Sequence, residues 1–324
     1  MTNGFRLIAV FALALATGAA HGQAAYPDKP VRIIVGFPAG VAPDIAARVL
    51  AEKLAEAWGK PVVVENVTGA GGNIGTERVA KAAPDGYTLG MVGNGSLIFS
   101  PGMYDKLAFD PVRDFAPISQ IFVAANALVV PVDSPVKSLP ELVAMARAQP
   151  GKLTYGHAGA GTSQHLGAEL FKIMAQVDIQ PVAYRGTTAL LPDLLAGRIS
   201  MSFANVANAL ALVREGKLRA FAVSSAKRSA SAPDLPTMAE SGYPGFEAVP
   251  WFGLMGPAGT PGPLIDRLNR DTVKVLSTPE VRKRFGSFGM DLVVGTPAEF
   301  AAAIERELPV WTKLIRQAGI KAAE

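Results

Sequence analysis

Short apolar runs alternate with helical patterns along the first half of the chain. Residues 31–35, Val-Arg-Ile-Ile-Val, form a β-branched run typical of a buried strand. The next apolar side chains have the spacing of one helical face, at Ile45, Val49, Leu50 and Leu54. Strand and helix patterns continue to alternate as far as residue 92. Such alternation predicts parallel βαβ units and an α/β fold.

A second series of alternating patterns begins near residue 127. The helix predicted at 138–149 begins with a capping box, in which Ser138 and Glu141 are three residues apart. The strand patterns of this series fall at 127–132, 153–156, 179–184, 199–203 and 218–223. We therefore expect a second α/β unit in the middle of the chain.

The two series predict two domains, each a mostly parallel sheet flanked by helices. We expect the last third of the chain, which opens with an apolar run at 251–256, to return to the first unit. The predicted division is residues 1–24 as a signal peptide, 25–124 with 226–324 as the first domain, and 125–225 as the second. The strand ends of the two domains are expected to face each other across a cleft.

The first 24 residues have the layout of a secretory signal peptide. Arg6 supplies a positive charge, residues 7–16 form a ten-residue apolar run, and small residues lead to Ala24. The run is shorter than the roughly 20 apolar residues of a membrane span. We predict cleavage after Ala24 and a location in the periplasm.

The composition of the expected mature chain excludes several kinds of functional site and partner. The absence of cysteine excludes disulfides, a thiolate nucleophile and a cysteine-linked lipid anchor. Three histidines argue against a histidine metal site, so we expect no metal and no cofactor. Loss of Arg6 leaves 30 basic against 27 acidic residues, and no cationic run occurs. This balance argues against nucleic-acid and membrane partners, and we expect a monomer.

Turns of small residues follow the predicted strands. Ligands of parallel α/β sheets bind beyond the carboxyl ends of the strands, where these turns lie. Two of the turns open helices, at 39–43 and at 160–163. A helix N-terminus offers free N–H groups and about half a positive charge, so it attracts a carboxylate without an arginine. Tight turns and ordinary helix caps are the alternative interpretation of each turn.

Several side chains in these turns have two possible roles. Asp44 could accept a hydrogen bond from a ligand or interact with the helix dipole. His165 could donate to a ligand carboxylate or pack in the interior, and Arg185 could bind an acidic ligand or form an ion pair. The predicted ligand-binding residues are Ala39, Gly40, Val41, Asp44, Gly93, Asn94, Gly95, Ser96, Gly161, Thr162, Ser163, His165, Tyr184, Arg185, Gly186, Ala204 and Asn205.

Enzyme signatures are weak in this sequence. It contains no Gly-x-Ser-x-Gly elbow and no His-Glu-x-x-His motif. The glycine-rich run at 69–72 fits neither the dinucleotide motif nor the phosphate loop. Asp44, Ser96 and His165 are conceivable as the triad of a periplasmic ester or amide hydrolase. We therefore favour a binding protein and keep the hydrolase as the alternative from another class.

Short motifs follow one another along essentially the whole mature chain. They lie at 26–35, 40–48, 69–75, 83–89, 110–117, 151–156, 184–186, 216–220 and 251–261. Each motif alone is weak, and their order and spacing carry a resemblance. Taken together, they resemble the extracytoplasmic receptors of tripartite tricarboxylate transporters, the Bug receptor family.

The resemblance implies a two-domain Venus-flytrap fold of the type II periplasmic binding proteins. It implies capture of a small carboxylate and delivery to a permease with one large and one small subunit. In the family, backbone amides and hydroxyls of opposing turns hold the near carboxylate, partly through ordered waters. We expect hinge strands near 120–128 and 222–228. A receptor that signals to a sensor kinase is the alternative within the same class.

Three positions depart from the family pattern. Val41 stands where glycine is usual, Pro43 where threonine or serine is common, and Ala204 where aspartate is common. Ala204 removes a polar group near the distal end of the ligand. We therefore expect a less polar pocket that favours a monocarboxylate or an aromatic carboxylate over a hydroxylated tricarboxylate.

Overall fold

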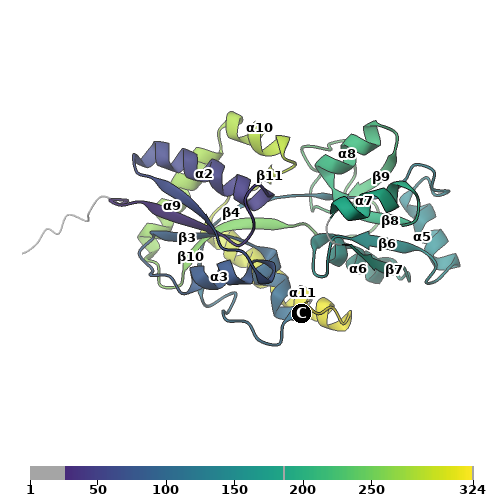
Figure 1. Ribbon diagram of the computed structural model, residues 1–324, viewed down its shortest axis with the longest axis horizontal. Helices are drawn as coiled ribbons and strands as arrows, with labels where there is room; N and C mark the ends of the chain where they lie inside the picture. The colour runs from purple at the N-terminus through teal and green to yellow at the C-terminus, as the bar shows by residue number, and fades with distance from the viewer. Residues whose placement is uncertain (1–25, 185–186, 323–324) are drawn as a thin grey trace, which may run out of the picture.

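The chain forms two lobes, each built around one β-sheet (Figure 1). This computed structural model describes residues 26–184 and 187–322. The predicted signal peptide lies outside the described residues, and so do Arg185 and Gly186. Among the described helices, none is both long enough and apolar enough to cross a membrane.

The first lobe contains a six-stranded sheet in the order β11-β4-β10-β3-β1-β2. Its strands are β1 (Val31–Val35), β2 (Val62–Asn66), β3 (Thr88–Gly93), β4 (Phe115–Val123), β10 (Trp251–Pro257) and β11 (Asp291–Leu292). Successive side chains of β1 point to opposite faces, so Ile33 and Ile34 belong to different hydrophobic clusters. Helices therefore cover both faces of this sheet.

Two sets of helices cover the first sheet (Figure 1). Around Ile33 lie α2 (Ala42–Trp58), α9 (Gly262–Leu276) and α10 (Pro279–Ser287). Around Ile34 lie α3 (Asn73–Ala80), the short helices η2 (Gly95–Phe99) and α4 (Ser100–Met103), and α11 (Pro297–Gln317). The apolar face of α2 predicted from the sequence is buried, including Val49, Leu50 and Leu54.

The second lobe contains a five-stranded sheet in the order β7-β6-β8-β5-β9. Its strands are β5 (Asn126–Pro131), β6 (Thr154–His157), β7 (Gln180–Ala183), β8 (Met201–Asn205) and β9 (Leu218–Val223). Its helices are α5 (Leu139–Ala148), α6 (Ser163–Ala175), α7 (Thr187–Leu195) and α8 (Val206–Arg214). Phe203 and Ala204 of β8 face different clusters, so this sheet too is covered on both sides.

Both sheets are mixed, where the sequence predicted mostly parallel ones. The pairs β1–β2, β1–β3, β6–β7 and β6–β8 are parallel. The other pairs are antiparallel. The path between the lobes explains most of these pairs. Strand β10 enters the first sheet from the second lobe and runs opposite to β3 and β4, while β5 enters the second sheet from the first lobe and runs opposite to β8 and β9. The prediction of two α/β units is confirmed.

Two segments carry the chain between the lobes, and they lie side by side. The first joins β4 to β5 at residues 123–126, and the N–H of Ala124 donates to the carbonyl of Pro250, 2.9 Å away. The second leads into β10, where Trp251 pairs with Val123. The first crossing lies where the sequence predicted a hinge strand.

The second crossing leads into β10 at 248–251, downstream of the hinge predicted at 222–228. Residues 236–248 first run along the edge of the second sheet, where Met238 N–H donates to the carbonyl of Val223 at 2.9 Å. Phe246 stacks on Phe203 of that sheet, with ring centroids 5.8 Å apart. Ser229 already contacts the first lobe before this segment, because its hydroxyl donates to Asp291 of β11 at 2.7 Å. The chain then enters the first sheet at Trp251.

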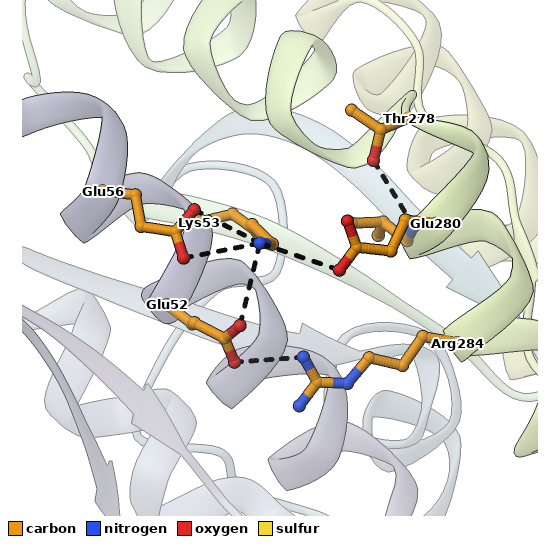
Figure 2. A network of polar contacts seen from close by, with 7 residues as sticks. Glu52, Lys53, Glu56, Thr278, Glu280 and Arg284 are labelled. Atoms are coloured by element: carbon orange, nitrogen blue, oxygen red, sulfur yellow. Dashed lines mark hydrogen bonds and ion pairs between the residues drawn. The ribbon is translucent and has the colours of Figure 1, made fainter.

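Ion pairs connect α10 to α2 in the first lobe (Figure 2). Lys53 Nζ lies 3.2 Å from Glu56 and 3.9 Å from Glu280, and Arg284 lies 3.0 Å from Glu52. Exposed pairs of this kind contribute about 0–1 kcal/mol each. They orient α10 on α2, while the apolar cluster below them supplies most of the stability.

A buried carboxyl group lies beside the second crossing. Trp251 Nε1–H donates to Glu307 Oε2 at 2.9 Å. Burial raises the pKa of Glu307 to about 7; the Trp251 hydrogen bond opposes this shift, the Glu247 charge adds to it, and Arg306 opposes it. Glu307 is therefore partly protonated near neutral pH.

We expect Glu307→Gln to stabilise the protein above pH 7 and to change its stability little at pH 5. The pKa of Glu307 is about 7 when folded and near 4.5 when unfolded, so the folded state binds more protons between these values. Stability from this group falls as pH rises through that window, by about 3 kcal/mol in total. Urea unfolding of both proteins at pH 5 and pH 8 measures the effect. The same difference at both pH values would contradict it.

Candidate functional site

Three turns meet at the carboxyl ends of β2, β1 and β3. A Cβ on Gly72, where φ is +100°, would lie 3.2 Å from Ser96 Oγ and 3.1 Å from the ring of Phe37. A Cβ on Gly36 would lie 2.7 Å from the carbonyl oxygen of Gly72. The glycines therefore let the turns after the three strands come into direct contact.

Asp44 holds the turn that precedes α2. Its Oδ2 accepts from the N–H of Gly40 at 2.8 Å and from Arg48 Nε at 2.9 Å, and its Oδ1 accepts from Asn66 Nδ2 at 2.9 Å. The residue is 1% exposed. Burial acts to raise the pKa of Asp44, but these three donors outweigh it and the pKa is lowered. Asp44 is thus an internal carboxylate that orders the turn.

The N-terminus of α2 is left without a side-chain cap. Val41 is the N-cap residue and makes no capping hydrogen bond, and its φ of −89° is ordinary for a β-branched residue. The neighbouring Gly40 takes the left-handed conformation instead, at φ +85°. The first N–H groups of a helix have no acceptor within the helix. Ala39, Gly40 and Val41 are all exposed, so these donors lie near the surface.

In the turn after β3, the side chain of Asn94 is hydrogen-bonded within the protein and the hydroxyl of Ser96 is not, among the described residues. Asn94 Nδ2 donates to the carbonyl of Val249 at 2.7 Å, which joins this turn to the second crossing. Gly93 lies under the ring of Phe252, which leaves no space for a side chain. Ser96 is 2% exposed, and its hydroxyl has no hydrogen-bond partner among the described residues.

The turn before α6 in the second lobe touches the first lobe. Thr162 caps α6: its Oγ1 accepts from the N–H of His165 at 3.3 Å and donates to the carbonyl of Gly159 at 2.8 Å. Gly161 has φ +71°, and a Cβ there would collide with the thioether of Met103 in α4. Ser163 Oγ accepts from Asn126 Nδ2 at 3.0 Å. The turn is therefore well ordered and lies against α4.

Two buried histidines stack beneath this turn. The rings of His157 and His165 are 4.1 Å apart and nearly parallel, at 10°. His165 Nδ1 accepts from the N–H of Gly161 at 3.2 Å. Burial lowers the pKa of His165 to about 4, assisted by the neighbouring His157, and burial also lowers the pKa of His157. Both rings are neutral at pH 7, so His165 can donate a hydrogen bond from Nε2 but supplies no positive charge.

The remaining predicted residues lie at strand ends of the second sheet. The hydroxyl of Tyr184 donates to Asp193 at 2.7 Å, so it points toward α7. Ala204 and Asn205 end β8 and pair with Ala127 and Asn126. The two other predicted members of the Tyr184 turn, Arg185 and Gly186, lie outside the described residues.

Asn73 is a candidate that the sequence analysis missed. It is 8% exposed and follows Gly72 at the start of α3. Its Oδ1 accepts from the hydroxyl of Ser100 at 3.0 Å, while its Nδ2 has no partner in the described part of the chain. An asparagine directly after two glycines at a helix start was the available signal, because this position places an amide at the converging turns.

The structure gives no support to a catalytic triad. Within residues 26–184 and 187–322, no hydrogen bond joins any two of Asp44, Ser96 and His165. Both oxygens of Asp44 accept from other groups, and His165 Nδ1 bonds to backbone. The same ranges contain no group of three or more acidic or histidine side chains placed to hold a metal ion.

Comparisons with known proteins point to one family. A family model described as "Tripartite tricarboxylate transporter family receptor" matches residues 46–320. Protein BugT of Bordetella pertussis is 37% identical over 324 residues, which cover 98% of this chain and 99% of BugT.

Two similar solved structures contain ligands. The structure described as "R. palustris Rpa4515 with adipate" is 34% identical with a TM-score of 0.76, covering 91% of this chain and 99% of that one. MatC from Rhodopseudomonas palustris with bound malate is 31% identical with a TM-score of 0.72, covering 90% of this chain and 100% of that one.

We expect His165→Asn to reduce the loss of stability in acid. Since the folded pKa of His165 is about 4 and the unfolded value is near 6.5, the unfolded state binds more protons between them. Stability from this group is lost as pH falls through that window, by about 3 kcal/mol in total. Asparagine keeps an acceptor for Gly161 but has no titrating ring. Urea unfolding between pH 7 and pH 4.5 provides the measurement.

Ser163→Ala, in the same turn, is the control for this comparison because it removes no titratable group. It should keep the pH dependence of the parent chain. If His165→Asn loses as much stability in acid as the parent does, the neutral buried ring is not the cause.

Proposed function

The chain belongs to the tripartite tricarboxylate transporter receptor family of periplasmic solute-binding proteins, and we propose that it captures a small organic carboxylate and delivers it to a membrane permease. Membership confirms the resemblance inferred from the sequence, and the relatives are binding proteins, not enzymes. Similar proteins that bind adipate and malate support a carboxylate ligand here.

The observation that carries the proposal is a set of unused donors at the converging turns of the first lobe. The N-terminus of α2 has no side-chain cap, Ser96 has an unpartnered hydroxyl, and Asn73 has an unpartnered amide, all within the described residues. Backbone N–H groups at a helix N-terminus bind anions well. Charge-assisted hydrogen bonds contribute about 1.5–3 kcal/mol each, so a few of them support micromolar binding.

Asp44 is assigned a positioning role in this proposal. Its oxygens are taken by Gly40, Arg48 and Asn66, so it orders the turn instead of contacting the ligand. His165 and the turn at 161–163 are assigned the opposite side of the ligand. Gly161 of this turn lies against Met103, which brings the turn close to the first lobe.

Closure of the two lobes is the proposed mechanism. The paired crossings at 123–126 and 248–251 form the natural axis, since they join the sheets. The proposed domains are therefore 25–124 with about 250–324, and 125 to about 250, with the monomer as the working unit. A ligand that contacts both lobes favours the closed state, and the permease recognises that state.

A sensor kinase would recognise the same closed state. Membership in a transporter receptor family favours a permease as the partner. Recovery of a large and a small membrane subunit with the liganded receptor would support delivery. Recovery of a kinase alone would assign the protein to signalling.

We expect carboxylates to raise the thermal midpoint of the protein expressed without residues 1–24. A ligand at 100 times its Kd adds about 2.7 kcal/mol, which moves the midpoint by several degrees. The panel contains C4–C8 carboxylates, citrate and benzoate, with alkylamines of equal length as controls. Prior denaturation and refolding removes any ligand that co-purifies. A panel with no shift for any carboxylate would overturn the proposal.

We expect Ser96→Ala to weaken carboxylate binding about tenfold or more with little change in stability. Its hydroxyl has no partner among the described residues, so its removal breaks no bond within the protein. The matched control is Ser100→Ala, because Ser100 Oγ lies 3.0 Å from both Asn73 Oδ1 and the carbonyl of Gly95. That variant should lose about 1–3 kcal/mol of stability. Calorimetric titration and urea unfolding of both variants measure the two effects.

A further inference from the structure

An apolar cavity of about 300 Å³ lies inside the second lobe, between α7, α8 and β8. Its size is at the lower end of the range for ligand pockets. Helix α7 contributes four leucines to it. The lining residues are Gln164, Thr187, Leu190, Leu191, Pro192, Leu194, Leu195, Ser202, Ala204, Asn208, Ala209, Leu212 and Leu218.

The wall of this cavity is uncharged. None of its described lining residues is acidic or basic. Two of its polar side chains already bond to backbone: Ser202 Oγ–H donates to the carbonyl of Gly156 at 2.9 Å, and Gln164 Oε1 accepts from the N–H of Ala158 at 3.0 Å. A carboxylate placed inside would lose its hydration without gaining a cation from these described residues.

One end of the cavity lies at the predicted ligand site. Gln164 and Ala204 come from the α6 turn and the end of β8, which belong to the candidate site. Leu218 lines the other end, because it pairs with Pro131 while Ala204 pairs with Ala127. Four residues along β5 separate these pairs, or about 13 Å. The cavity therefore runs from the carboxyl ends of the strands into the lobe.

We propose that this cavity takes the apolar tail of the ligand, so that the substrates are monocarboxylates with an alkyl or aryl tail. The inference rests on the proposed function, which places the carboxylate at the converging turns. The carboxylate is held outside by neutral donors, and the tail passes Ala204 into the leucine-lined space. Ala204 matters because a larger or charged side chain there would block the entrance.

Matched pairs of acids test the tail. Butanoate, hexanoate and octanoate are compared with succinate, adipate and suberate, and benzoate with terephthalate, so that each pair differs by one distal carboxylate. We expect affinity to rise about fourfold per methylene among the monocarboxylates, equivalent to about 0.8 kcal/mol. Each monocarboxylate of six or more carbons should bind at least tenfold more tightly than its diacid. Calorimetric titration gives both quantities.

Variants that fill the cavity test its location. Ala204→Leu at the entrance and Ala209→Leu further inside should each abolish the rise with chain length. Ala144→Leu is the matched control, because Ala144 is exposed on α5 of the same lobe. It should keep the chain-length dependence, and thermal midpoints show whether each variant is folded. The two substituted residues lie on different elements, Ala204 on β8 and Ala209 on α8. If one variant fails to fold, the other still provides the test.

The outcomes separate this inference from the proposed function. Carboxylate binding in which diacids equal or exceed monoacids would overturn the tail cavity and leave carboxylate capture standing. A monoacid preference that survives in both folded cavity variants would overturn the assignment of the tail to this cavity. No carboxylate binding at all would overturn the proposed function and this inference with it.

Discussion

The hydrogen bonds of Asp44 are the constraint on which the proposed binding surface of the first lobe depends. A helix N-terminus that is to receive a ligand needs an ordered turn before it, yet an ordinary side-chain cap would occupy the same N–H groups. Asp44, in the first turn of the helix, orders the preceding turn without capping the helix. Its carboxylate accepts from the N–H of Gly40, one residue before the N-cap, and from the amide of Asn66 on β2. These hydrogen bonds hold the turn in place without using the N–H groups of Val41 and Ala42.

Much of this architecture could be predicted from local patterns in the sequence. The β-branched run at 31–35, the apolar face of α2 and the turns after the strands follow from side-chain periodicity, and each is present. The direction of β10 was not readable, because it depends on where the chain returns from the other lobe. The late crossing at 248–251 depends on tertiary contacts such as Phe246 on Phe203, which no local pattern records.

Some features of the candidate site could likewise be predicted from the sequence, and others could not. Sequence placed Gly40, Ser96 and Thr162 in turns, and composition suggested neutral donors. It could not separate residues that bind the protein from residues left free, because that depends on distant partners. Asn94 is tied to Val249, more than 150 residues away, whereas Ser96 has no partner among the described residues. The unpaired amide of Asn73 is visible only once Ser100 is seen to take its oxygen.

The electrostatics of the two lobes also follow from burial without compensating charge. Burial lowers the pKa of His165 and raises that of Glu307, so both groups favour their neutral forms. Their effects on stability have opposite signs over nearly the same pH range, so the contributions of these two groups offset each other there. The same preference for neutrality extends to the α6 turn, which offers a ligand donors without a fixed cation. In the proposed function this site holds one carboxylate through hydrogen bonds, and the described residues of the cavity offer no charge to hold a second one inside the lobe.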